Sequence, residues 1–109
     1  MVRQVEIGGA VRPVSFGMNC LASFSKETGI GFSDMVTEIP MYARLAIIYY
    51  ALIDGARIEK KDFNHTQEEV GDWIGTDIDL LNKLIRMFIE DWVPESKNVV
   101  SPASKAKKS

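Results

Sequence analysis

The sequence predicts an α+β fold, mostly α, in which an N-terminal β-hairpin is followed by about five helices. Two short runs rich in β-branched residues flank Gly8-Gly9, a pattern typical of a hairpin with a tight turn. From Met18 onward, apolar residues recur at helical spacing in segments that glycine or proline interrupts. The length of 109 residues corresponds to about one domain.

The hairpin is expected over Val2–Ile7 and Val11–Phe16. Pro13 lies in the second run and has no backbone N–H to donate. We therefore expect this strand to have a free edge or to stop early.

The expected helices are delimited by residues suited to begin or end a helix. They cover Met18–Thr28, Asp34–Glu38, Met41–Asp54, Thr66–Ile74 and Thr76 to about Asp91. The expected caps and stops are Gly29, Ser33, Pro40, Gly55, the capping box Thr66–Glu69, Gly75, the second cap in Thr76–Asp79, and Pro94. Arg57–Asn64 is polar and is expected to form a loop.

The helix over Met41–Asp54 is expected to be the central element of the core. Leu45–Ile53 is an unbroken run of nine apolar or aromatic residues, far short of the roughly 20 that cross a membrane. A helix that is apolar on every side is normally buried among its neighbours. The flanking helices show narrower stripes: Met18, Leu21 and Phe24 in one, and Ile78, Leu81, Leu84 or Ile85, Phe88 and Trp92 in the other.

Charge divides the chain into two parts. Residues 1–93 carry nine basic and fourteen acidic side chains, a net charge of −5, and are expected to form a single globular domain. Residues 94–109 have a net charge of +3 and few apolar residues, so we expect a disordered basic tail. An acidic body does not suit binding to phosphate backbones.

Cysteine usage and the N-terminal residues predict a cytoplasmic protein. Cys20 is the only cysteine, which excludes an intramolecular disulfide and suits a reducing compartment. With one histidine, His65, the usual structural zinc sites are excluded as well. The first residues alternate charge and apolarity, unlike a signal peptide.

No set of residues predicts an active site or a cofactor, so we expect a protein that is not an enzyme. His65 fits a position at a helix start, and Cys20 fits a small buried hydrophobe. Adjacent acidic residues such as Glu68-Glu69 do not face each other on a helix. Gly8-Gly9 lacks the spacing and the lysine of a phosphate loop.

Residues 67–86 offer an alternative, a small helix-turn-helix DNA-binding regulator. Two helices around Gly75 carry apolar residues at the positions that such a corner needs. The second helix, however, would present Asp77, Asp79 and Asn82 to the DNA, with Lys83 as the lone cation. Carboxylates there would repel the phosphates.

The two longest expected helices carry more large apolar side chains than a small body is expected to bury. Any that remain outside would form a protein-binding surface, where tyrosine, tryptophan and methionine are favoured. The candidate partner-binding residues are Tyr42, Ile47, Tyr50, Met87, Phe88 and Trp92.

The order and spacing of several segments also resemble a known family. They are V-x-I-G-G-x-V-R-P-V-x-F (5–16), E-T-G (27–29) with Phe32 and Ser33, D-G-A (54–56), and T-Q-E-E-V-x-D-W-I (66–74). Together they resemble the tail assembly chaperones of long-tailed bacteriophages and prophages, over residues 2–93.

This resemblance implies a non-enzymatic protein of the bacterial host cytoplasm that is absent from the mature virion. Its partners would be the tape-measure protein, whose apolar helices it shields, and the tail tube protein. A structural connector subunit of the tail is a further alternative. Presence in purified particles would distinguish the connector from the chaperone.

Overall fold

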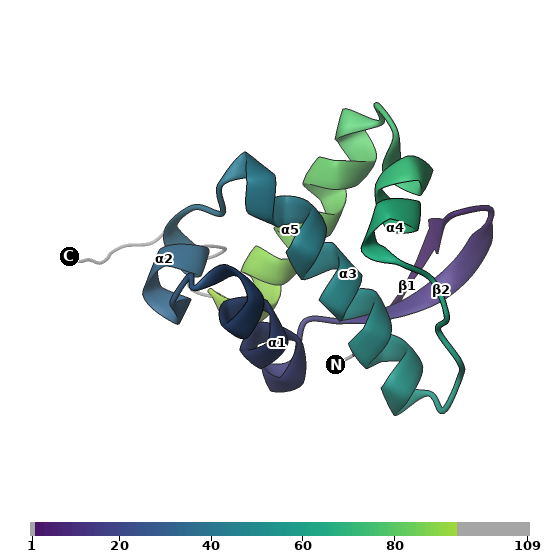
Figure 1. Ribbon diagram of the computed structural model, residues 1–109, viewed down its shortest axis with the longest axis horizontal. Coiled ribbons are helices and arrows are strands. Elements are labelled where there is room, and N and C mark those ends of the chain that lie inside the picture. The colour runs from purple at the N-terminus through teal and green to yellow at the C-terminus, as the bar shows by residue number, and fades with distance from the viewer. Residues whose placement is uncertain (1, 94–109) are drawn as a thin grey trace.

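The computed structural model describes residues 2–93 and confirms the predicted hairpin followed by five helices (Figure 1). The elements are β1 (Val2–Ile7), β2 (Ala10–Ser15), α1 (Met18–Thr28), α2 (Phe32–Thr37), α3 (Met41–Ile58), α4 (Gln67–Ile74) and α5 (Ile78–Trp92). The predicted disordered tail, residues 94–109, lies outside the described residues. All seven elements contribute buried side chains to one hydrophobic core.

The hairpin forms because two glycines adopt the backbone geometry that a tight turn requires. Gly8 and Gly9 have φ angles of 68° and 79°, as expected of a turn that matches the twist of paired strands. Pro13 stands opposite Gln4 in the antiparallel register, and the strand continues past it to Ser15. Of the two predicted alternatives, β2 has the free edge and does not stop early, because a two-stranded sheet leaves an outer edge where proline needs no partner.

The hairpin turn is held against α4 by an aromatic ring. A Cβ on Gly8 would lie 2.5 Å from the ring of Trp73, so the indole packs directly on the glycine backbone. The guanidinium of Arg12 lies 4.3 Å from the centroid of the same ring, which adds a cation–π contact.

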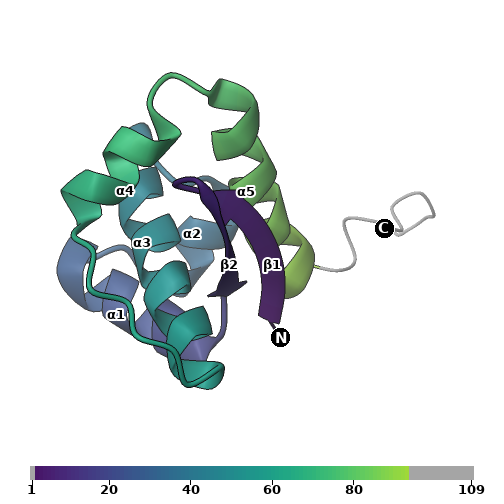
Figure 2. The same cartoon turned by 90° about the vertical axis from the view of Figure 1, so that its right-hand side faces the viewer.

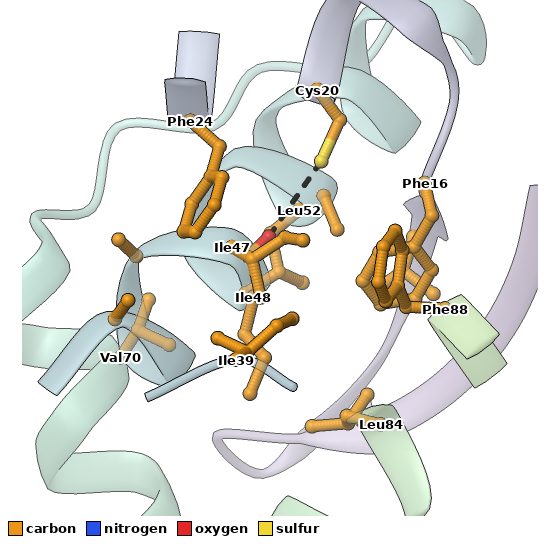
Figure 3. Packing of buried hydrophobic residues seen from close by; sticks show 14 of the residues in the cluster. Phe16, Cys20, Phe24, Ile39, Ile47, Ile48, Leu52, Val70, Leu84 and Phe88 are labelled. Carbon is orange, nitrogen blue, oxygen red and sulfur yellow. Dashed lines mark hydrogen bonds between the residues drawn. The ribbon is translucent and has the colours of Figure 1, made fainter. Parts of the chain in front are cut away.

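Helix α3 is the central element, as predicted. It contacts both strands and the helices α1, α4 and α5 (Figures 1 and 2). Figure 3 shows its side chains Ile47, Ile48 and Leu52 between Phe24 of α1 on one side and Phe88 of α5 on the other. Each of these five side chains is at most 1% exposed. The all-round apolarity of this helix thus matches a position enclosed on several sides.

The predicted end of α3 at Gly55 is wrong, because the helix continues to Ile58. Gly55 is a contact residue, since a Cβ there would lie 2.4 Å from the carbonyl oxygen of Pro13. The buried Asp54 carboxylate pairs with Arg57 one turn later, with 2.8 Å between Oδ1 and Nη2. The chain leaves the helix only near Lys60, where φ is 58°.

Predicted helix starts were right for α1, α3 and α4 and wrong for α2. Thr66 and Glu69 form the predicted capping box, with N–O distances of 3.1 Å and 2.7 Å. Asp77, inside the predicted second cap, accepts a hydrogen bond from the Leu80 N–H at 3.0 Å. Ser33 is not the cap of α2, which begins after Gly31. Phe32 therefore belongs to the first turn of that helix.

Replacing Gly55 by alanine is expected to lower the free energy of unfolding by about 1–3 kcal/mol, although alanine favours helix by about 1 kcal/mol. The new methyl group would push α3 away from the backbone of β2. Urea unfolding followed by circular dichroism measures the effect. Gly71→Ala is the matched control, because its Cβ would meet only the flexible end of Leu45, at 3.2 Å. Equal stability of Gly55→Ala and the natural chain would contradict the close contact.

Candidate partner-binding site

An open apolar pocket of about 260 Å³ lies between α1, α2 and the C-terminal end of α5. Its walls are Met18, Leu21, Ala22, Ser25, Phe32, Met35 and Trp92. None of these side chains is charged. We call this feature the apolar pocket.

Helix geometry explains how these side chains reach one place. Met18 and Leu21 are three residues apart on α1, as are Phe32 and Met35 on α2, so each pair shares a helix face. In each pair the first residue is exposed and the second is buried: Met18 is 65% and Phe32 47% exposed, whereas Leu21 and Met35 are 3% and 2% exposed. Leu21 and Met35 therefore form the base of the apolar pocket, and Met18 and Phe32 form its rim.

Trp92 forms the third wall, and two contacts fix its orientation. Its indole N–H donates a hydrogen bond to the carbonyl oxygen of Phe16, in the segment that joins β2 to α1. Its ring meets Phe32 edge-on, with ring centroids 5.4 Å apart. A half-buried tryptophan with a satisfied N–H is the type of anchor favoured at protein interfaces.

Two of the six predicted partner-binding residues are wrong as surface residues, because Ile47 and Phe88 are both 0% exposed. Ile47 lies in the middle of α3, where the Cys20 thiol donates to its carbonyl oxygen with an S–O distance of 3.7 Å (Figure 3). Phe88 packs against Phe16, with ring centroids 5.9 Å apart. Both side chains belong to the hydrophobic core.

The other four predicted residues do not form one patch. Trp92 lines the apolar pocket. Tyr42 is 74% exposed but is not one of the pocket walls. Met87 is half-buried against the core. Tyr50 lines a separate polar cleft and donates a hydrogen bond to Glu27, with an O–O distance of 2.6 Å.

Sequence reasoning missed Met18 and Phe32 as surface residues. Met18 was assigned to the apolar stripe of its helix, but the buried residues of α1 are Cys20, Leu21 and Phe24. At roughly 100° of rotation per residue, Met18 lies beside Leu21 at the margin of the buried stripe, on the side away from Cys20 and Phe24. Grouping Cys20 with Leu21 and Phe24 in the sequence would have revealed Met18 as a residue of the pocket rim.

The polar cleft and the two residues with reactive side chains show no catalytic arrangement. The cleft between α1 and α3 measures about 410 Å³, and its Asp54 and Arg57 are already paired. Burial raises the pKa of the Cys20 thiol, so this thiol is not an activated nucleophile. His65 precedes the N-cap Thr66, as predicted, and lies 3.6 Å from the Glu69 carboxylate.

Two other kinds of functional element are absent from residues 2–93. No group of three or more histidine, cysteine, aspartate or glutamate residues in this range is placed to hold a metal ion. No helix in this range has both the length and the apolarity to cross a bilayer.

The corner between α4 and α5 has the two-helix arrangement that the alternative hypothesis, a helix-turn-helix DNA-binding regulator, predicts. Its second helix exposes Asp79, Asn82, Lys83 and Arg86. Asp77, which caps that helix, is exposed as well. The surface offered to a phosphate backbone is therefore of mixed charge, unlike the basic face of a DNA-binding helix.

No protein-family model, no curated protein and no solved structure matches this chain. The resemblance to tail assembly chaperones therefore stays a prediction. The apolar pocket is the structural feature from which a function is argued.

The hydrogen bond to the Glu27 carboxylate, together with burial and the negative charge, raises the pKa of Tyr50 to about 12. Because this pKa lies above that of an unfolded tyrosine, about 10, the contribution of Tyr50 to stability is complete below pH about 10. It is lost as the pH rises toward about 12. Titration of tyrosinate absorbance in a Tyr42→Phe/Tyr49→Phe background measures this pKa. Adding Glu27→Gln is expected to return it toward the ordinary value, and an unchanged pKa would refute the hydrogen bond.

Proposed function

We propose that the protein is a non-enzymatic tail assembly chaperone of a long-tailed phage or prophage. It binds apolar helices of the tape-measure protein in the host cytoplasm, before the tail tube assembles around them. The observation that supports this function is the apolar pocket, whose rim residues Met18 and Phe32 are exposed and whose walls carry no charge. The resemblance of residues 2–93 to this family supplies the identity of the partner.

The shape and chemistry of the pocket suit one side of an apolar helix. Amphipathic helices bind in grooves through large side chains spaced three or four residues apart. A volume of about 260 Å³ holds one or two such side chains, and the Trp92 indole gives them a flat contact surface. Binding to a single site of this size is weak, and many copies along one long target would add their contributions.

Other exposed apolar residues support a protein-binding role but do not define a second site. They are Val11, Met41, Tyr42, Ile58 and Ile78. They are spread over β2, α3 and α5. Among the large exposed hydrophobic residues within 2–93, only Met18 and Phe32 line the apolar pocket.

The test is co-expression of the full chain with a tape-measure fragment that contains apolar helices. The natural chain is expected to keep the fragment soluble and to be recovered in complex with it. Met18→Asp and Phe32→Asp are each expected to weaken binding at least about tenfold, because a buried apolar side chain contributes about 1.5–3 kcal/mol. Both positions are exposed, so the fold should tolerate the substitution.

Val11→Asp is the matched control, since Val11 is 64% exposed on the hairpin, away from α1 and α2 (Figure 1). This variant is expected to bind the fragment like the natural chain. Circular dichroism verifies that all three variants are folded. The proposed function fails if the natural chain neither solubilises nor binds the fragment. The assignment of binding to the apolar pocket fails if Met18→Asp and Phe32→Asp bind the fragment as well as Val11→Asp does.

A further inference from the structure

The C-terminal end of α5, beside the apolar pocket, has an excess of negative charge. Glu90 and Asp91 lie in its last turn, and this turn contains no basic residue. Arg3 reaches both carboxylates, at 2.6 Å from Asp91 and 3.8 Å from Glu90. One cation thus faces two carboxylates, at the helix end where the backbone dipole is also negative.

This negative end is continuous with the apolar pocket. A second hollow of about 150 Å³ is lined by Phe16, Gly17, Asp91 and Trp92. Trp92 is a wall of both hollows. A ligand that contacts Trp92 in the apolar pocket therefore lies near Asp91, the carboxylate that lines the second hollow.

We propose that the helix which occupies the apolar pocket carries a lysine or arginine about one turn from its apolar anchor, and that this cation binds beside Glu90 and Asp91. This inference rests on the proposed function and specifies the chemistry of the bound segment. A basic side chain at this position adds a second cation beside the two carboxylates that share Arg3, at the negative end of the helix dipole.

The charge of residues 1–93 favours the same kind of partner, although the +3 of residues 94–109 brings the net charge of the whole chain to −2. Residues 1–93 have a net charge of −5, so a basic helix is attracted to the body before it docks. The Glu90 side chain is 35% exposed and is open to a ligand. The Asp91 side chain is 10% exposed and already engaged with Arg3, so Glu90 is the carboxylate to substitute.

The experiment measures binding of two synthetic amphipathic peptides to the full chain by fluorescence anisotropy at low ionic strength. The peptides share one apolar face, and the residues flanking it are lysines in one peptide and glutamates in the other. The lysine peptide is expected to bind about two- to fivefold more tightly, as measured for exposed charge pairs. Added salt should reduce this difference.

Glu90→Gln is expected to reduce the preference for the lysine peptide, and Glu90→Lys to abolish or reverse it. Glu6→Lys is the matched control, because Glu6 is exposed at the turn end of β1, far from α2 (Figure 1). It makes the same charge change and is expected to leave the preference close to that of the natural chain.

The outcomes separate this inference from the function on which it rests. Equal binding of the two peptides, or tighter binding of the glutamate peptide, overturns the charge requirement. The same holds if Glu6→Lys changes the preference as much as Glu90→Lys does. If both peptides bind the natural chain and Met18→Asp abolishes this binding, the apolar pocket remains the binding site. If neither peptide binds the natural chain, the proposed function itself loses its support.

Discussion

The rest of the structure depends on the close contact between α3 and β2 at Gly55. There the helix lies so near the backbone of Pro13 that no side chain fits between them. This contact seats the hairpin on the central helix and buries Val14 and Phe16, which are 1% and 2% exposed. Glycine in a helix interior costs about 1 kcal/mol relative to alanine, and here the close packing of helix on strand offsets that cost.

The position of the candidate site follows from the same contact. Once β2 is seated, Phe16 is placed between the hairpin and α1, where its ring packs on Phe88. Its carbonyl oxygen then accepts the hydrogen bond that orients Trp92. The Trp92 wall of the apolar pocket thus depends on both ends of the described residues, because the last turn of α5 is bonded to the segment that follows the hairpin. A partner bound there contacts an indole that a hydrogen bond and a ring contact hold in place.

Local chemistry explains what could be predicted from the sequence. The two-glycine turn and the capping box at Thr66 depend on neighbouring residues, and both are found as expected. Gly55 was read as a helix stop because glycine commonly ends helices, whereas its role depends on Pro13, 42 positions away. The candidate site was predicted only at Trp92, because exposure of Met18 and burial of Ile47 depend on which neighbours pack against each helix.

The apolar pocket and the negative end of α5 would make different contributions to binding. Burial of apolar side chains supplies most of the affinity but sets no direction, because an apolar stripe looks similar from either end of a helix. Charge at one end of the site distinguishes the two orientations, since only one places a cation beside Glu90. A long target bound by many copies requires such a direction if every copy is to sit in the same sense. Weak apolar anchoring combined with one oriented charge contact would therefore suit the proposed function, in which many copies bind along one helix in the same direction and are later released.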